Sequence, residues 1–211
     1  MKIIPILTLL LLILSACTAA QNPSGDIASD QPMAILATAQ GPNCNPAPIE
    51  APTPPSIIPG YTELDPATGL HMTGTVQVID FSSYRLQVTG LVEQPLSLQY
   101  DDLRCLAKVT ASPKLVCPGV FVDTAEWSGV PISEILQLAR LKPEASRISL
   151  ISADGYKMDF DLEIARNPEN FLAYELEGKP IPVIHGFPLR AIFPDKLGSD
   201  WVKWLVEIAV K

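Results

Sequence analysis

The sequence predicts an α+β domain that is rich in β-sheet. Short runs that alternate apolar and polar residues are typical of half-buried strands, and residues 84–89 form the clearest of them. The helical patterns between such runs are short, which is unlike the regular alternation of strand and long helix in a doubly wound sheet. With 211 residues, the chain is long enough for one domain with a real core and too short for two comfortable ones.

The first 17 residues have the features of a secretory signal. A charged Met1-Lys2 start is followed by an apolar run over residues 3–14, which is too short to span a bilayer. The tetrapeptide L-S-A-C at 14–17 resembles a bacterial lipobox, in which the mature chain begins at a lipid-modified Cys17. This implies export and retention on the outer face of a bacterial membrane by acyl chains. An ordinary signal peptide with an incidental cysteine is the alternative.

Residues 18–60 are expected to form a disordered tether. They contain nine prolines, with Asn, Ser and Gln between them. This composition buries too little apolar surface to fold and favours extended conformations. The folded domain is therefore assigned to residues 61–211.

The first half of the domain predicts strands and two helices. Val76 and Val78 suggest a partner strand before residues 84–89, and Ser97 is a plausible N-cap for a short helix that ends at Leu106. Residues 108–117 should be extended. A second helix should follow Gly129-Val130-Pro131. Its buried face should consist of Ile132, Ile135, Leu136 and Ala139.

The second half predicts a hairpin and three further strands. Alternating runs at 148–150 and 156–160 flank Asp154-Gly155, a typical turn pair. A short helix at 162–166 and a strand at 171–176 come next, and a turn at 177–180 ends that strand. The last strands are expected at 187–193 and 202–210.

The charge and the cysteines limit the function. The formal net charge of −8 excludes a broad basic surface for nucleic acid, so an anionic ligand needs a local cationic cluster. Beyond Cys17, three cysteines remain, and exported thiols tend to pair. If Cys44 and Cys105 form a disulfide, Cys117 is left free; the sequence leaves that pairing open.

Cys117 is the main candidate for a metal ligand. It ends an apolar run and is followed at once by Pro118-Gly119, where regular strand pairing must stop, so its sulfur can face a cavity. A deprotonated thiolate is a suitable ligand for a soft or redox-active metal. A buried structural cysteine is the alternative.

Three stretches carry a family resemblance. They are C-P-G with W-S-G-V-P ten residues after the cysteine, then L-A-Y-E-L-E-G-K-P-I-P, and finally H-G-F-P-L-R-A-I-F-P with V-K-W-L downstream. Together they resemble the sulfite-oxidase-type molybdopterin-binding oxidoreductase domain from about residue 84 to 211. The resemblance implies that family's fold, with mixed β-sheets and short helices, and one molybdenum held by the dithiolene of a molybdopterin and by Cys117.

The resemblance also implies roles for five other residues. His185 and Arg190 match positions that reach the pterin and its phosphate, and a guanidinium can bind a phosphate bidentately. Lys203 matches a cofactor-contacting lysine, although a strand at 202–210 could equally turn it to solvent. Tyr174 matches the active-site tyrosine, with a buried structural tyrosine as the alternative. Asp154 lies where a loop often approaches the cofactor or substrate, and it could equally be only a turn residue.

Two departures from the family qualify the implied chemistry. Sulfite oxidases place an arginine shortly after the ligand cysteine, whereas this chain has P-G-V-F-V, so a less charged substrate fits better than sulfite. No C-x-x-C-H haem motif is present, so electrons should pass through a separate carrier. The expected protein is a monomeric, lipid-anchored enzyme that transfers an oxygen atom on a small substrate. The alternative is a non-catalytic lipoprotein that uses the same fold as a binding module.

Overall fold

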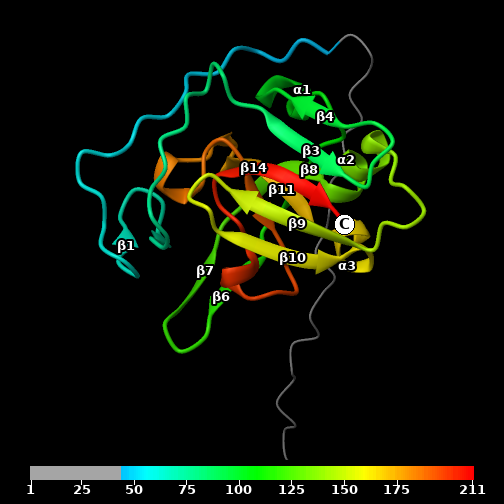
Figure 1. Cartoon of the computed structure of the whole chain (residues 1–211). Coiled ribbons are helices and arrows are strands. Elements are labelled where there is room, and N and C mark those ends of the chain that lie inside the picture. The colour runs from blue at the N-terminus through cyan, green and yellow to red at the C-terminus, as the bar shows by residue number, and fades with distance from the viewer. Residues whose placement is uncertain (1–43) are drawn as a thin grey trace, which may run out of the picture. The chain divides into compact units, whose positions relative to one another are not determined.

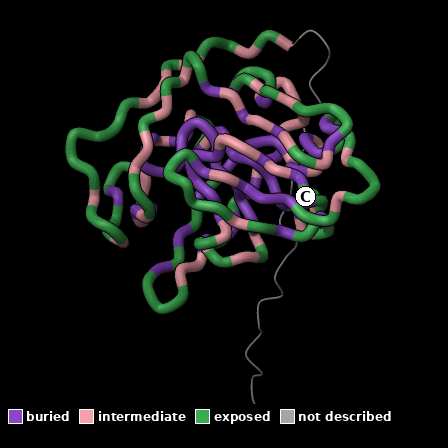
Figure 2. The backbone as a smooth tube through the Cα atoms, viewed as in Figure 1, coloured by how far each residue is buried: buried purple, intermediate pink, exposed green. Residues whose placement is uncertain are grey.

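The computed structural model describes residues 44–211, so the predicted signal segment, Cys17 and residues 18–43 lie outside the described residues. The described chain contains two five-stranded sheets with short helices beside them, which confirms the predicted α+β class (Figure 1). The buried backbone follows the strands, and exposed loops surround it (Figure 2). Within this part of the chain, no helix has the length and apolar character needed to cross a membrane.

The C-terminal strand is the centre of the first sheet. The sheet has the order β10-β9-β14-β3-β4. Its strands are β10 (Lys157–Asp161), β9 (Arg147–Ser152), β14 (Leu205–Val210), β3 (Leu86–Gly90) and β4 (Leu96–Leu98). β14 runs antiparallel to β9 and parallel to β3, so Ile208 pairs with both Leu150 and Val88. All three side chains are fully buried, and a one-residue slip would expose them, so burial fixes the register.

The second sheet has the order β12-β11-β8-β5, with β13 also paired to β11. Its strands are β5 (Val109–Ala111), β8 (Trp127–Pro131), β11 (Phe171–Leu176), β12 (Lys179–Pro180) and β13 (Arg190–Ile192). Residues 171–174 of β11 are all buried, as expected for a strand covered on both faces. β13 pairs Arg190 with Ala173, and this pairing places a cation in the interior.

The helices are short and cover the edges of the core. They are α1 (Tyr100–Arg104), α2 (Ile132–Ala139) and α3 (Leu162–Arg166), with the 3-10 turns η1 (Val183–His185) and η2 (Gly198–Asp200). The predicted apolar face of α2 is buried in full: Ile132, Ile135, Leu136 and Ala139 all contribute to the core. Pro131 stands just before the first turn, where its missing N–H has no consequence.

Two small hairpins complete the fold. β6 (Lys114–Cys117) and β7 (Phe121–Thr124) form one, which projects from the body of the domain in Figure 1. β1 (Leu64–Asp65) and β2 (Leu70–His71) form the other, closed by a turn in which the Gly69 N–H donates to the Asp65 carbonyl. β2 lies against β7, because the backbone N–H of His71 donates to Asp123 at 2.7 Å.

The structure corrects three local predictions. Val76 and Val78 form no strand, and Val78 is exposed, so this short alternation has no apolar face to bury. Ser97 does not cap a helix; it pairs with Gln87 in the sheet, and α1 begins three residues later at Tyr100. The strand predicted at 187–193 is restricted to β13, since Pro188 has no N–H to offer a sheet.

The N-terminal boundary of the domain also lies earlier than predicted. Cys44 and Cys105 form a disulfide whose Cα atoms are 5.5 Å apart. Ile49 and Ala51 pack against the hydrophobic core, and Arg104 donates to the Ala47 carbonyl at 3.0 Å. Residues 44–60 contain no helix or strand, as expected from their prolines, but they belong to the domain rather than to a free tether.

Replacement of Cys44 by Ser should lower the free energy of unfolding by about 2–4 kcal/mol, because a bridge between distant residues restricts the unfolded chain. The separation of 61 residues places this bridge among the long-loop cases. Urea denaturation followed by tryptophan fluorescence measures the change. Reduced wild-type protein should match Cys44→Ser, and Cys117→Ser should unfold like the oxidised wild type. Equal stability of Cys44→Ser and oxidised wild type would show that the bridge contributes nothing.

Candidate functional site

A small cavity of about 120 Å³ opens beside Cys117. Cys117 is the free cysteine of the described chain and is partly exposed at the end of β6. Its sulfur can face the cavity because the chain turns at once through Pro118 and Gly119, and Gly119 has a φ of 74° that favours glycine. The cavity is lined by Tyr61, His71, Thr73, Leu115, Cys117, Phe121, Arg190, Gly198 and Ser199.

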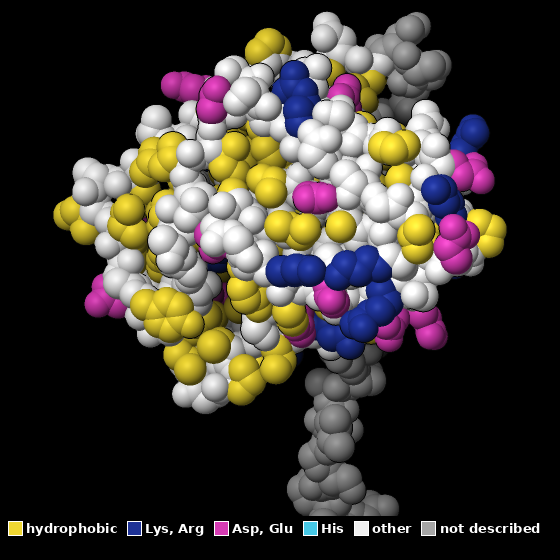
Figure 3. Space-filling view, viewed as in Figure 1, with side chains coloured by type: hydrophobic (Ala, Val, Ile, Leu, Met, Phe, Trp, Pro, Cys, Tyr) yellow, Lys and Arg dark blue, Asp and Glu magenta, His cyan; other side chains and the backbone are white. Residues whose placement is uncertain are grey.

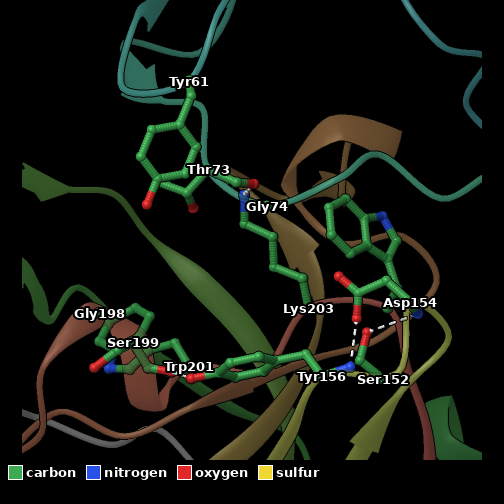
Figure 4. Close-up of a pocket in the computed structure, with 11 residues that line it drawn as sticks. Tyr61, Thr73, Gly74, Ser152, Asp154, Tyr156, Gly198, Ser199, Trp201 and Lys203 are labelled. Atoms are coloured by element: carbon green, nitrogen blue, oxygen red, sulfur yellow. Dashed lines mark hydrogen bonds between the residues drawn. The ribbon is translucent and has the colours of Figure 1, made fainter.

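A second cavity of about 240 Å³ adjoins the first and shares four lining residues with it. The shared residues are Tyr61, Thr73, Gly198 and Ser199. Figure 4 shows Lys203 and Asp154 on the wall of this second cavity, with Tyr156 across its floor. The two cavities therefore bring Cys117, Arg190, Lys203 and Asp154 to one region of the surface.

Three basic side chains lie buried behind these cavities. The exposed fractions are 0% for His185, 3% for Arg190 and 7% for Lys203. Gly186 makes this close approach possible: its φ is 118°, and an added Cβ would lie 3.2–3.3 Å from atoms of Lys203 and Arg190. The surface cations, in contrast, have carboxylate partners. The lysines and arginines over β9 and β10 lie among acidic side chains (Figure 3).

Arg190 is held by aromatic rings rather than by a carboxylate. Its guanidinium carbon lies 4.9 Å from the centre of the Trp127 ring and 5.6 Å from that of Trp201. Its Nη1 donates to the His185 carbonyl at 3.2 Å, while its buried Nε has no partner. Burial lowers the pKa of Arg190, and the charge of Asp123 opposes that shift. The side chain is therefore an incompletely satisfied cation, positioned to bind an anion.

Lys203 is buried rather than turned to solvent, and the strand predicted at 202–210 is shorter than expected. β14 begins only at Leu205, and Trp204 has a φ of 47°, so no alternation extends through residues 202–204. The Lys203 ammonium donates to the carbonyls of Thr73 at 2.8 Å and Ile184 at 3.3 Å. Burial is the main cause that lowers the pKa of Lys203, and the positive charge of Arg190 is the second. An anion bound in the cavity would offset both effects by stabilising the protonated ammonium.

His185 is a neutral imidazole at neutral pH. Burial, followed by the charge of Lys203, lowers its pKa to about 4, although its bond to Asp65 opposes the shift. Its Nε2 lies 2.9 Å from both the Asp65 carboxylate and the Thr68 hydroxyl. A carboxylate only accepts, so Nε2 carries the proton and Nδ1 is the acceptor. That Nδ1 atom is buried without a partner and is free to accept from a ligand N–H.

The structure does not bring Tyr174 to the cavities. Its ring is buried in an aromatic cluster, 5.9 Å from that of Tyr100, and its carbonyl accepts from the Tyr100 hydroxyl at 2.9 Å. Burial raises the pKa of its phenol. The geometry favours the structural role, and the catalytic role of Tyr174 stays a prediction. Tyr61 and Tyr156 are the tyrosines that line the second cavity.

Asp154 shapes the β9–β10 turn and also faces the second cavity. Its carboxylate accepts from the Tyr156 N–H at 2.9 Å, and Gly155 follows with a φ of 86°. The Tyr156 hydroxyl in turn donates to the Ser199 carbonyl at 2.9 Å. The predicted hairpin is therefore present, and one residue serves both as its turn former and as part of the cavity wall.

Sequence reasoning missed the contribution of the β1–β2 hairpin. Asp65 binds His185, while His71 binds Asp123 through an Nδ1–Oδ1 distance of 2.7 Å. Thr73 lies two residues after β2, and its carbonyl accepts from Lys203. The D-P-A-T-G run at 65–69 is a turn signature that could have revealed the hairpin, but nothing local indicates its partners.

These features fit a molybdopterin cofactor. Its phosphate is anionic, and Arg190 and Lys203 are buried cations that no carboxylate neutralises by an ion pair within residues 44–211. Arg190 Nε offers a free donor, and His185 Nδ1 offers a free acceptor. The described residues contain no cluster of three or more His, Cys, Asp or Glu that could hold a metal ion. Cys117 is the thiol that lines the cavity, and a dithiolene could complete a metal site at its sulfur.

A free cysteine at a cavity wall, next to buried cations suited to a phosphate, is the arrangement expected of an oxidoreductase domain that binds molybdopterin. The chain belongs to the family described as oxidoreductase molybdopterin binding domain, whose family model matches residues 73–211. The predicted sulfite-oxidase-type family and its Mo-molybdopterin cofactor are both confirmed by this membership.

Known proteins resemble the chain over most of this range. Sulfite oxidase of Arabidopsis thaliana is 29% identical over 65% of this chain and 44% of its own length. A protein of Azospira oryzae assigned as the protein-methionine-sulfoxide reductase subunit YedZ1 is 30% identical over 64% of this chain and 52% of its own. The chain therefore spans about half the length of these relatives.

Structural similarity points to the same fold. The sulfane dehydrogenase SoxCD of Paracoccus pantotrophus has a TM-score of 0.61 over 82% of this chain and 55% of its own, at 20% sequence identity. This similarity supports a sulfite-oxidase-type fold with mixed sheets and short helices.

Folding stability should depend on the protonation of His185. The imidazole has its ordinary pKa near 6.5 when unfolded and about 4 when folded, so the unfolded chain binds the extra proton between these values. The contribution of His185 to the free energy of unfolding is fully present above pH 6.5. It decreases by about 3 kcal/mol as the pH falls toward 4. Urea denaturation of cofactor-free protein at pH 7 and pH 4 measures this loss.

His185→Gln is the matched control for this dependence, because it keeps a side-chain donor for Asp65 but does not titrate. Between pH 7 and pH 4, the free energy of unfolding of this variant should fall by about 3 kcal/mol less than that of the wild type. The part of the decrease that comes from carboxylates should be the same in both proteins. The same acid sensitivity in both proteins would contradict a buried neutral His185.

Proposed function

We propose that this chain is a molybdenum-molybdopterin oxidoreductase that transfers an oxygen atom to or from a small substrate. The observation that carries the proposal is the free Cys117 thiol beside a cavity that the buried, incompletely satisfied Arg190 also lines. Membership of the oxidoreductase family supports it, and relatives include a sulfite oxidase and an assigned methionine-sulfoxide reductase subunit.

The roles of the side chains follow from their positions. Cys117 would ligate the metal through its sulfur, and the bound cofactor would supply a centre that exchanges two electrons and one oxygen atom with substrate. Arg190 and Lys203 would neutralise the phosphate, and the unpartnered Nδ1 of His185 would accept a hydrogen bond from the pterin. Phe121 and Leu115 keep the wall beside the sulfur apolar, which limits water at the reacting position.

The substrate should be neutral, with sulfoxides and N-oxides favoured over a sulfite-like anion. The residues that follow Cys117 on its hairpin, up to Val122, carry no charge. Arg190 is the cation that lines the Cys117 cavity, and the cofactor requires it. An anionic substrate would therefore have to share a cation that the phosphate already occupies. Electrons pass to or from a separate carrier, because the sequence has no C-x-x-C-H motif.

A non-catalytic binding module is the competing proposal. Val120 and Val122 are 57% and 60% exposed on the projecting β6–β7 hairpin, and such side chains suit a contact with another protein. A binding module would fold without metal, whereas the enzyme must hold it, so the metal content separates the two proposals.

Replacement of Cys117 by Ser should abolish both the metal and the activity, since the site offers one thiolate. Protein from a molybdopterin-producing host should contain about one molybdenum atom per chain as wild type and almost none as Cys117→Ser. Plasma mass spectrometry measures this content. Turnover of dimethyl sulfoxide, trimethylamine N-oxide and sulfite with a viologen carrier measures activity, and the neutral substrates should react faster.

Val122→Ser is the matched control, because it changes an exposed side chain on the same hairpin. It should keep the wild-type metal content and turnover. Folded wild-type protein without molybdenum and pterin would refute the enzyme and leave the binding module.

The chain is also proposed to be a monomeric lipoprotein, exported and anchored to the outer face of a bacterial membrane through Cys17. The lipobox L-S-A-C supports this proposal. Cys17→Ala should move the protein from the membrane to the soluble fraction, because two or more acyl chains would no longer anchor it. Immunoblots of fractionated cells measure the distribution, with Cys44→Ser as the control for loss of another cysteine. Unchanged membrane retention of Cys17→Ala would refute the anchor.

A further inference from the structure

His71 forms a tightly held pair with Asp123 at the wall of the Cys117 cavity. One carboxylate oxygen lies 2.7 Å from Nδ1 of the ring, and the other accepts from the His71 backbone N–H at 2.7 Å. The Asp123 side chain is 4% exposed and that of His71 is 27% exposed. A buried carboxylate thus holds both the backbone and the ring of one partly exposed histidine.

A second contact fixes the plane of the ring. The His71 imidazole stacks on Phe121, with 4.3 Å between ring centres and 5° between the planes. Phe121 is the residue that pairs with Cys117 across the β6–β7 hairpin. Both rings and the sulfur line the same cavity. The hairpin that presents the thiol therefore also orients the imidazole.

This geometry determines which nitrogen is available. A carboxylate oxygen only accepts hydrogen bonds, so Nδ1 carries a proton and donates to Asp123. Nε2 is then the nitrogen that can exchange a proton with other molecules. No side-chain or backbone group in residues 44–211 is hydrogen-bonded to it. The second histidine, His185, is fully buried and bound to Asp65, so it cannot serve the same purpose.

We propose that His71 is the catalytic acid of oxygen-atom transfer, and that Asp123 is the residue that positions it. The proposal rests on the proposed function. For a sulfoxide, the sulfur–oxygen bond would break, sulfur would gain two electrons, and the oxygen would take up two protons and leave as water. The two electrons would be supplied by the cofactor that Cys117 would hold, and an external one-electron carrier would replace them. His71 delivers one proton from Nε2, solvent delivers the other, and the open side of the ring allows reprotonation.

The charges around the dyad are compatible with this role. Asp123 on β7 faces the ring directly, and Arg190 on β13 and Cys117 on β6 line the same cavity. Tyr61, from the chain segment that leads into β1, is the phenol on the wall. Any pH dependence of turnover must be assigned among these groups, so the test uses readouts that address the imidazole itself.

The first readout is chemical rescue in cofactor-loaded protein. His71→Ala should retain the wild-type molybdenum content but reduce dimethyl sulfoxide with a kcat lowered about 10²–10⁴-fold, the usual contribution of general acid catalysis. Added imidazole should restore part of the rate, and a series of substituted imidazoles should restore it according to their pKa values. A structural role of His71 would produce no such relation. Val122→Ser again serves as the control with unchanged rate.

The second readout does not need turnover. The chain contains two histidines, so protein labelled with ¹⁵N-histidine gives two imidazole spin systems, which His71→Ala assigns. The His71 signals should show a protonated Nδ1, and dimethyl sulfone, a non-reduced analogue with similar oxygen acceptors, should shift its Nε2 resonance and leave His185 unchanged.

Three results would overturn the proposal. They are a wild-type kcat in molybdenum-loaded His71→Ala, loss of molybdenum from that variant, and an Nε2 resonance of His71 that does not respond to dimethyl sulfone. A wild-type protein that carries no molybdenum would instead contradict the proposed function. The two failures are therefore distinguishable.

Discussion

The structure depends on the burial of positive charge that forms no ion pair within the described residues. The chain is acidic overall, with a formal charge of −8, yet Arg190 and Lys203 lie in its interior. Burying an ion without a partner is costly, and proteins normally avoid it. Two buried carboxylates are near, but Asp65 binds His185 and Asp123 binds His71, and neither forms an ion pair with the two cations within residues 44–211. A ligand with negative charge would supply the counterpart to both cations.

Several structural devices keep these cations inside the domain. Trp127 and Trp201 face the guanidinium, and backbone carbonyls from two distant segments accept from Lys203. One of these carbonyls belongs to Thr73, directly after the β1–β2 hairpin. The chain before that hairpin is joined to α1 by the Cys44–Cys105 disulfide. Tyr61 and His71 also line the Cys117 cavity, so residues before position 73, where the family model begins, contribute to the site.

Local patterns predicted much of the fold. The α3 helix at Leu162–Arg166 and the β11 strand at Phe171–Leu176 match their predicted ranges, because the apolar residues of both elements are the ones that the fold buries. Ser97 shows the limit: its preference for a helix N-cap is overridden by pairing with β3. The short alternation at Val76 and Val78 similarly lacked any core to face.

The site was predicted less completely than the fold, since its contacts join segments that are far apart in sequence. The resemblance indicated Cys117, Arg190 and Lys203, and the structure places all three at the adjoining cavities. His71 had no local signal, because its partner Asp123 is 52 residues away. Tyr174 had a signal from its neighbours, yet its ring lies among other aromatic side chains. Sequence motifs indicate which residues matter near a cofactor, whereas only the fold shows which way each side chain points.

The distribution of charge also bears on the choice of substrate. Under the proposed function, the buried cations Arg190 and Lys203 would both bind the cofactor, and the wall next to Cys117 otherwise consists of apolar, hydroxyl and imidazole groups. An anionic substrate gains little from such a wall, whereas a neutral oxygen donor needs only one hydrogen-bond donor at its oxygen. The proposed role of His71 would supply that donor from the wall of the Cys117 cavity, with Asp123 holding the ring. Selectivity in this domain would then come from the absence of free positive charge near the thiolate, combined with one oriented imidazole.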